Sequence, residues 1–361
     1  MFYYFILPLK EYVSFLRLFQ YITFRSAYAA LTAMLLVLIL GNLVIRQLQM
    51  LKLGEEIRKL GPETHKQKAG TPTMGGVIII GAVLISIILW GNFSSLYLII
   101  LIGATILLGT LGFCDDYIKS ILKRKEGIPA KVKLMFQVFI ALAAAFLIYY
   151  FPSNRGEVSN FYVPFINEEI LDMKFWWIIF AVVVIVAATN AVNFTDGLDG
   201  LAIGSVITVG VSLGLMAYLT GNSKIAAYLR IPYIPDAAEI TVYLAALMGA
   251  SLGFLWFNTN PATVFMGDTG SLALGGIIGI VAVMIKKEIF LFIVGGVLVM
   301  EVLSVIIQVA SYKLRGKRVF KMSPIHHHFE LSGWSEQKVV VRMWILGIIL
   351  AILGLSSLKI L

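Results

Sequence analysis

The sequence has little cysteine, little charge and none of the glycine patterns by which soluble enzymes bind nucleotides. One cysteine, Cys114, occurs in 361 residues, which excludes an internal disulfide and a cysteine-based zinc site. The chain contains neither a G-x-G stretch nor a Walker A motif, which argues against dinucleotide-binding and ATP-hydrolysing enzymes. Charged residues make up 14%, against about 25% in soluble domains, so an ordinary soluble protein is not indicated.

Apolar residues make up 59% of the chain, and they occur in long runs along its whole length. Runs of about 20 apolar residues are long enough to cross the hydrocarbon of a bilayer as helices. Residues 1–22, in which Arg17 lies among aromatics, indicate an interfacial segment. The pattern predicts one all-α integral membrane domain, residues 1–361, with about ten transmembrane helices: 23–45, 74–90, 96–113, 133–151, 175–191, 199–219, 240–257, 270–285, 289–311 and 340–358.

Lysine and arginine are unevenly distributed between the loops, and this predicts the orientation. The loops after the first, third and ninth spans are rich in both, whereas the loops after even-numbered spans hold few. Cytoplasmic loops carry the excess of positive charge, so we expect loop 312–339 in the cytoplasm and both termini in the periplasm. Segment 152–174, a short hairpin or irregular cap, and segment 221–239, a small helix and loop, are then periplasmic. Three residues near the N-terminus run against this rule: Lys10, Arg17 and Arg25.

Polar motifs gather in the loops assigned to the cytoplasm, or at their edges. They are GTPTMGG (70–76), DDYIK (115–119), NAVNFTDGLDG (190–200), FNTNPATVFMGDTGS (257–271) and PIHHHFELSGW (324–334). Carboxylates at a membrane boundary are costly without a partner. Several on one side therefore indicate a Mg²⁺ site, and the nearby basic loops indicate phosphate chemistry. The carboxylates concerned are Asp115, Asp116, Asp196, Asp199 and Asp268.

Each aspartate motif also has a structural interpretation, and the sequence leaves both open. The adjacent Asp115 and Asp116 could end a helix in solvent. Asp268 precedes an apolar span and could cap that helix, although a helix start also favours a bound phosphate. The 190–200 stretch could likewise supply a helix cap, yet a spacing of three would align its four polar residues on one helix face: Asn190, Asn193, Asp196 and Asp199.

Three of the four histidines are consecutive, His326, His327 and His328. Consecutive side chains cannot all bind one metal with ordinary geometry, so we expect hydrogen bonds to a pyrophosphate, or a structural role in the loop, instead of zinc. Glu301 and Gln308 lie seven residues apart, on one face of an otherwise apolar span. A carboxylate buried there is either a site residue or the partner of a basic loop residue.

Together these motifs resemble the phospho-N-acetylmuramoyl-pentapeptide transferase family. The resemblance covers essentially the whole chain and rests on KAGTPTMGG, GFCDDYIK, NAVNFTDGLDGLA, GFLWFNTNPATVFMGDTGSLALGG and SPIHHHFELSGW. The histidine block distinguishes this branch from other polyprenyl-phosphate sugar-1-phosphate transferases, which share the aspartate motifs. The resemblance, closest to Gram-negative members, implies a ten-helix enzyme of the bacterial inner membrane, usually a homodimer, with a cytoplasmic active-site cleft.

The resemblance also implies the reaction. UDP-N-acetylmuramoyl-pentapeptide and undecaprenyl phosphate would give lipid I and UMP in the first membrane step of peptidoglycan synthesis. Mg²⁺ is the implied cofactor, and the implied partners include the bilayer but no nucleic acid.

Residue roles follow by resemblance at matching positions. Asp268 is implied as the principal Mg²⁺ ligand, with Asp115 and Asp116 beside it, and His327 as a further catalytic residue. Asp115 is either a base toward the lipid phosphate or an electrostatic and metal-positioning residue, since a phosphate needs little help to lose its proton at pH 7. The implied substrate-binding residues are Lys68, Thr73, Lys119, Lys131, Asn190, Asn193, Asp196, Asn258, Phe265, His326 and His328.

Two other functions remain as alternatives. One is a sister transferase that moves N-acetylglucosamine-1-phosphate from UDP-GlcNAc to the same lipid, against which the histidine block argues. The other is a transporter or lipid flippase. Transporters place polar residues near the membrane midplane, often within inverted repeats, whereas here these residues cluster toward one face.

Overall fold

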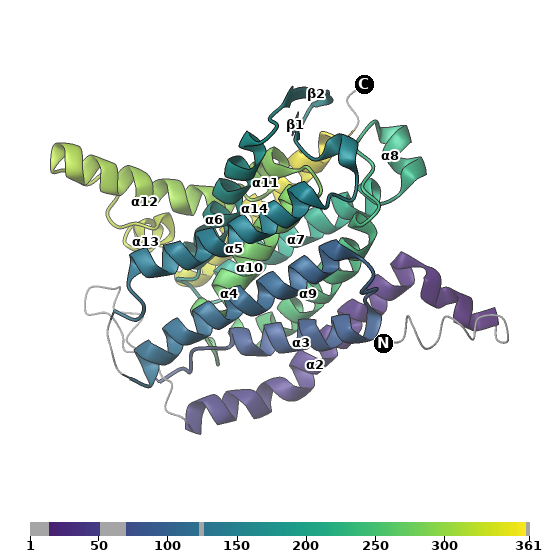
Figure 1. Cartoon of the computed structure of the whole chain (residues 1–361). Coiled ribbons are helices and arrows are strands. Elements are labelled where there is room, and N and C mark those ends of the chain that lie inside the picture. The colour runs from purple at the N-terminus through teal and green to yellow at the C-terminus, as the bar shows by residue number, and fades with distance from the viewer. Residues whose placement is uncertain (1–13, 51–69, 123–125, 359–361) are drawn as a thin grey trace.

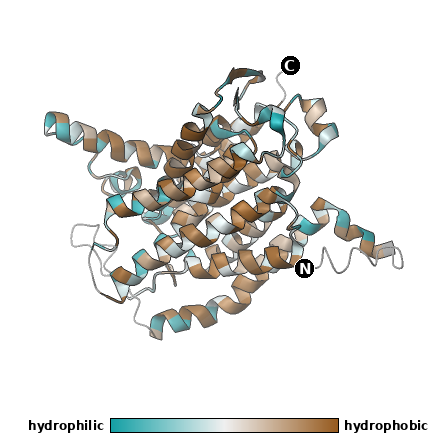
Figure 2. Cartoon of the chain, in the orientation of Figure 1, coloured by the Kyte–Doolittle hydropathy of each residue, from teal (hydrophilic) through white to brown (hydrophobic). Residues whose placement is uncertain are grey.

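The computed structural model describes residues 14–50, 70–122 and 126–358, which form a bundle of long helices with one two-stranded hairpin (Figure 1). The bundle is mainly hydrophobic along its helices (Figure 2). In chain order the elements are η2 (Ser14–Gln20), α2 (Ile22–Met50), α3 (Gly76–Trp90), α4 (Leu96–Ser120), α5 (Ala130–Tyr150), η4 (Arg155–Glu157), β1 (Asn160–Val163), β2 (Ile166–Asp172), α6 (Trp176–Thr195), α7 (Leu201–Thr220), α8 (Ser223–Leu229), α9 (Ala237–Asn258), α10 (Gly267–Met284), α11 (Glu288–Val294), α12 (Gly296–Arg315), α13 (Ile325–Glu330) and α14 (Glu336–Ser356).

Within the described residues, nine helices are long and apolar enough to cross a membrane: α2, α4, α5, α6, α7, α9, α10, α12 and α14. Large apolar side chains such as Ile39 and Ile352 are exposed on these helices, as expected of a surface that faces lipid. The prediction of an all-α multi-pass membrane protein is therefore confirmed. The predicted span 74–90 forms α3, whose 15 residues reach only about 23 Å, less than the hydrocarbon thickness.

The predicted span 289–311 is not one continuous helix. It is divided at Gly295 into the short α11 and the longer α12, which projects away from the bundle (Figure 1). Two adjacent glycines, Gly295 and Gly296, disfavour an uninterrupted helix at this point. The apolar run gave the correct composition for a span but not the break within it.

Segment 152–174 folds as the hairpin that was one of its two predicted forms. Strands β1 and β2 pair antiparallel, with Val163 opposite Ile166 next to the turn. Segment 221–239 contains α8, whose start is capped by the Asn222 side chain, as the prediction of a small helix requires. The hairpin and α8 lie at the same end of the bundle (Figure 1).

Arg25, one of the exceptions to the charge rule, lies inside the bundle. Arg25 is buried near the start of α2, where its guanidinium donates to both carboxylate oxygens of Glu239 and to the carbonyl of Trp90. Glu239 therefore neutralises Arg25 inside the bundle. Lys10 and the rest of residues 1–13 lie outside the described residues, so the structure describes only the last part of the predicted interfacial segment.

Helix α10 is the centre of the bundle. Every residue from Thr269 to Met284 is buried, and α10 packs between α4 and α6. A helix that is apolar on all sides is suited to a protein core or to lipid, and here neighbouring helices cover it. Its two ends reach the two boundaries of the bundle, with Asp268 at the first and Lys286 and Lys287 just beyond the second.

Candidate functional site

Three carboxylates meet where α4 ends and α10 begins. Asp115 and Asp116 lie near the end of α4, and Asp268 lies in the first turn of α10. One oxygen from each can be chosen so that all three lie within 4.8 Å of one another. Asp115 and Asp116 are buried, whereas Asp268 is partly exposed. We call these three residues the aspartate cluster.

Two lysines bridge the aspartate cluster. Lys119, one helical turn after Asp115, has its Nζ 2.5 Å from Asp115 Oδ2 and 3.1 Å from Asp268 Oδ2. Lys133, at the start of α5, has its Nζ 3.0 Å and 2.6 Å from the same two oxygens. Three carboxylates thus face two ammonium groups, which leaves an excess of negative charge. Hard carboxylate oxygens in this arrangement are suited to a small divalent cation such as Mg²⁺.

Asp116 holds the beginning of α10 in place. Its Oδ1 accepts a hydrogen bond from the Asp268 backbone N–H, and its Oδ2 accepts from both the N–H and the hydroxyl of Thr269. The first N–H groups of a helix have no partner within it, so a carboxylate from a neighbouring helix satisfies them and complements the helix dipole. The sequence left open that Asp268 caps α10. It does not, because the N-cap residue of α10 is Met266.

Glycines bring the two backbones close enough for these contacts. A Cβ on Gly112 of α4 would lie 2.1 Å from the carbonyl oxygen of Asp268, so only glycine fits there. Gly267 has φ +74°, and a Cβ on it would lie 2.6 Å from Asp116 Oδ2 and 2.9 Å from Thr73 Oγ1. The absence of a side chain allows both the close approach and the left-handed conformation. These glycines therefore set the spacing of the aspartate cluster, and they place Thr73 beside it.

Of the 190–200 stretch, Asn193 joins the aspartate cluster. Its Nδ2 donates to Asp268 Oδ1 at 2.7 Å and to Ser271 Oγ at 2.8 Å. Asn190, one turn earlier on α6, instead donates to Gln137 Oε1 and to a backbone carbonyl of its own helix. Asp196 is partly buried at the C-terminal end of α6, so it caps no helix start.

Asp199 and Asn258 belong to a separate network. Asp199 Oδ2 accepts hydrogen bonds from Asn260 Nδ2 and from the Ala262 backbone N–H. Asn258 accepts from the Gly200 N–H and donates to the Val264 carbonyl. These bonds fix the loop between α9 and α10. The five aspartates expected on one side therefore do not all converge, because the chain uses Asp199 to order a loop.

The three histidines contact three different partners. His326 is fully buried, and its Nδ1 lies 3.0 Å from Glu301 Oε2. His327 Nδ1 lies 2.9 Å from Glu330 Oε2, and His328 Nδ1 accepts the Lys321 backbone N–H. Glu301 thus pairs with a loop residue, one of the two roles expected for it. Such divergent contacts agree with the argument against one metal bound by all three rings.

Three other residues were predicted to bind substrate: Lys68, Phe265 and Lys131. Lys68 lies outside the described residues. Phe265 is partly buried, and its backbone pairs with the 70–76 stretch, donating to Pro72 and accepting from Gly75. Lys131 is exposed.

Sequence reasoning missed Lys133, two residues after Lys131. Residues two apart on a helix point in nearly opposite directions, so one of these lysines faces the bundle and the other faces away. Gln137, four residues after Lys133, is buried and accepts a hydrogen bond from Asn190. The polar pair Lys133 and Gln137, four residues apart, is the sequence signal by which the inward face of α5 could have been found.

The sequence of the chain is similar to those of known enzymes. The family model Glycosyl transferase family 4 matches residues 98–286, and a phospho-N-acetylmuramoyl-pentapeptide-transferase signature matches residues 68–80. The chain is 47% identical to the phospho-N-acetylmuramoyl-pentapeptide-transferase of Brachyspira hyodysenteriae, with 98% of each chain covered. It is 48% identical to the proteins of that name from Leptospira biflexa, with 96% of each covered, and Desulforapulum autotrophicum, with 100% of each covered.

Proposed function

The chain belongs to the phospho-N-acetylmuramoyl-pentapeptide transferase family, and we propose that its aspartate cluster is the place at which it performs the family's reaction. As a multi-pass bacterial membrane protein, it transfers phospho-N-acetylmuramoyl-pentapeptide from its UDP derivative to a lipid phosphate, forming lipid I and releasing UMP. The acceptor we propose is undecaprenyl phosphate. The observation that carries the proposal is the meeting of three carboxylates and two lysines at the end of membrane-spanning helices.

The proposed reaction is a phosphoryl transfer between two anions. An oxygen of the lipid phosphate attacks the β-phosphorus of the UDP-sugar, and the bond from that phosphorus to the bridging oxygen breaks as UMP leaves with the electron pair. Charge repulsion opposes this encounter, so nearby cations lower its barrier. Lys119 and Lys133 bridge the carboxylates and are placed to contact phosphate oxygens as well. The helix ends put this chemistry where a lipid and a soluble nucleotide can both arrive.

We propose Mg²⁺ as the cofactor, with Asp268 as its principal ligand and Asp115 and Asp116 as further ligands. The donor set fits this ion, because three carboxylates exceed the two ammonium groups that face them. When bound, Mg²⁺ would neutralise charge on the pyrophosphate and on the departing UMP. Asn193 keeps Asp268 oriented through its hydrogen bond to Oδ1, and Asp116 fixes the backbone from which Asp268 projects.

Asp115 has an electrostatic and metal-positioning role in this proposal, in preference to that of a base. A phosphate monoester has its second pKa at about 6 and is mostly ionised at pH 7, so it gains little from a base. Asp115 Oδ1 accepts the Ile128 backbone N–H at 2.7 Å, and Oδ2 lies between the two lysines. These contacts orient Lys119 and Lys133 toward Asp268.

The remaining predicted residues would bind the substrates. Thr73 and Asp196 lie near the ends of elements that meet at the aspartate cluster, and Phe265 would stack on uracil. His327 would contact the pyrophosphate or the sugar. We assign further substrate contacts to Lys68, Lys119, Lys131, Asn190, Asn258, His326 and His328.

We also propose how the protein is oriented in the membrane. The nucleotide is cytoplasmic, so the cleft and loop 312–339 would face the cytoplasm, with both termini in the periplasm and the protein as a homodimer. A reporter fused within 126–129 should report a cytoplasmic location, and one within the β1–β2 hairpin a periplasmic one. The opposite result at either position would contradict the assignment.

The function is tested by substrate choice. Purified protein with undecaprenyl phosphate should release UMP from UDP-N-acetylmuramoyl-pentapeptide and not from UDP-GlcNAc, and removal of Mg²⁺ should stop the release. Equal turnover of UDP-GlcNAc would favour the sister transferase. Lipid movement across vesicles without UMP release would favour the flippase alternative. The names of the relatives favour neither alternative.

A further inference from the structure

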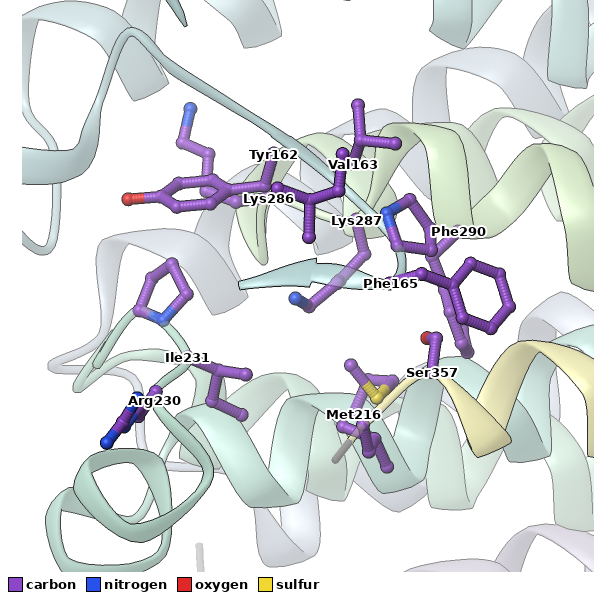
Figure 3. Close-up of a pocket in the computed structure, with 14 residues that line it drawn as sticks. Tyr162, Val163, Phe165, Met216, Arg230, Ile231, Lys286, Lys287, Phe290 and Ser357 are labelled. Atoms are coloured by element: carbon purple, nitrogen blue, oxygen red, sulfur yellow. The ribbon is translucent and has the colours of Figure 1, made fainter. Parts of the chain in front are cut away.

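A small cavity, partly open to solvent, lies at the end of the molecule opposite the aspartate cluster, beneath the β1–β2 hairpin (Figure 3). Helix α10 has 18 residues and separates the two places by about 27 Å, close to the thickness of the hydrocarbon. The cavity is enclosed by the hairpin turn, the loop after α8, the last turns of α7 and α14, and the start of α11. It therefore lies at the other boundary of the membrane-spanning bundle.

Lys287 projects its ammonium into this cavity (Figure 3). Among the described residues its Nζ has no hydrogen bond or ion pair, although the side chain is only partly exposed. Lys286 differs, because its Nζ binds the Val158 carbonyl and lies 3.9 Å from the centre of the Trp177 ring. Glu288 is the nearby carboxylate, and it acts on both lysines without a direct bond to Lys287. Burial lowers the pKa of Lys287 to about 8, a desolvation cost that a bound anion would offset.

The rest of the lining combines one more cation with apolar walls. Arg230 is exposed at the cavity, while Phe165 and Ile166 of the hairpin turn provide exposed hydrocarbon surface. Two cations without a hydrogen bond or ion pair in the described part of the chain, beside apolar walls, fit a ligand that is anionic at one end and apolar at the other. Inorganic phosphate would use the cations but would leave the apolar walls uncovered.

The backbone around the cavity is also unusual. Five non-glycine residues of the described chain have positive φ, and three of them line this cavity: Phe165, Arg230 and Lys286. Side chains disfavour this conformation, so it persists where the surroundings require it, often at ligand sites. Together with the projecting lysine, it indicates a formed site in preference to a packing defect.

We propose that this cavity binds the phosphate headgroup of an anionic phospholipid in the leaflet opposite the aspartate cluster. Lys287 contacts the phosphate from inside the cavity, and Arg230 contacts it from the rim. The first part of the acyl chains lies against Phe165 and Ile166, which line the cavity and are exposed. The bound lipid neutralises the buried ammonium and holds the hairpin against the ends of α7 and α14. This proposal does not depend on the chemistry at the aspartate cluster.

The test is lipid binding to the full-length protein in neutral detergent, followed by native mass spectrometry. Phosphatidylglycerol and phosphatidylcholine of matched chains are the two probes. Wild type should bind phosphatidylglycerol at least about tenfold more tightly than phosphatidylcholine, and Lys287→Met should remove most of that difference. Lys224→Met, at an exposed position of α8 at the same end, is the matched control and should bind as wild type does. Equal affinity of wild type for the two lipids would overturn the proposal.

The melting temperature of Lys287→Met will show whether this variant folds. A second variant, Arg230→Gln, tests the site if it does not. Arg230→Gln changes an exposed side chain and should lower the affinity for phosphatidylglycerol several-fold without altering the fold. Unchanged affinity in Arg230→Gln, or in folded Lys287→Met, would contradict the site. Displacement of the lipid by an equal concentration of inorganic phosphate would also contradict it, because the apolar walls would then add nothing. The readout is binding, so it is independent of the transfer assay.

Discussion

The two ends of helix α10 carry opposite imbalances of charge. At its start, Asp115, Asp116 and Asp268 face Lys119 and Lys133, so anionic groups are in excess. Just beyond its last residue, cations are in excess, and the Lys287 ammonium has no direct partner among the described residues. The same buried helix thus has the proposed divalent-cation site at one boundary and the proposed anion site at the other.

The ends also differ in how the backbone contributes. At the aspartate end, glycines let α4 and α10 approach so closely that Asp116 binds the first N–H groups of α10. At the lysine end, non-glycine residues in strained conformations enclose a cavity. The first arrangement positions charged groups rigidly, as a reaction requires, whereas the second leaves space for a ligand.

The largest expected effect is at the aspartate end. Asp268→Asn removes one ligand charge with little change in volume, and we expect transfer to fall by about 10³-fold while the fold is retained. Initial rates of UMP release, with melting temperature as the folding check, measure it. The matched control is Asp172→Asn, an exposed aspartate of β2 at the other end, which should keep wild-type activity. Activity within a few-fold of wild type in Asp268→Asn would refute the ligand assignment.

The close helix contact gives the next largest effect. In Gly112→Ala the new Cβ would overlap the carbonyl oxygen of Asp268, so α4 and α10 must separate and the aspartate cluster must widen. A displacement near 1 Å costs about 10²-fold in rate. Gly103→Ala, on the same helix and with nothing within 4 Å of its new Cβ, is the control and should be neutral. If both variants behaved alike, the glycine contact would not position the site.

A smaller effect separates the two lysines at the start of α5. Lys133→Gln removes a cation from the aspartate cluster, and we expect about a tenfold loss in kcat. Lys131→Gln, at an exposed position, should change the rate less. Steady-state kinetics at saturating substrate compare them. A larger loss for Lys131 would restore the original prediction from the sequence.

The smallest effect is on stability at the lysine end. Burial lowers the pKa of Lys286 and Lys287 to about 8, below the value of about 10.4 in an unfolded chain. Between these values the unfolded state binds more protons, so stability rises with pH, and the cost of burial is fully present below about pH 8. We expect the melting temperature of lipid-free protein to rise by a few degrees from pH 8 to 9.5, and less in Lys287→Met. A melting temperature that falls between pH 8 and 9.5 would contradict the predicted direction of the pH dependence.

Ten spans were predicted, and nine helices of the described chain are long and apolar enough to cross a membrane, close to the predicted bounds. Hydropathy and length alone decide whether a helix can cross a bilayer, and α3 has the hydropathy without the length. The break at Gly295 was missed, since a glycine within an apolar run permits either a straight or an interrupted helix. At the site, the sequence identified Asp115, Asp116 and Asp268 by their place at the ends of spans. It missed Lys133 and Gly112, whose importance depends on which face of each helix meets its neighbour.

The most direct test of the central claim is the binding of Mn²⁺, a paramagnetic substitute for Mg²⁺, measured by electron paramagnetic resonance on purified protein. The claim is that the aspartate cluster holds the divalent cation used in transfer. Wild type and Asp172→Asn should each bind one Mn²⁺ per chain, displaced by Mg²⁺, and Asp268→Asn should bind it at least about tenfold more weakly. Equal Mn²⁺ affinity in wild type and Asp268→Asn would contradict the account.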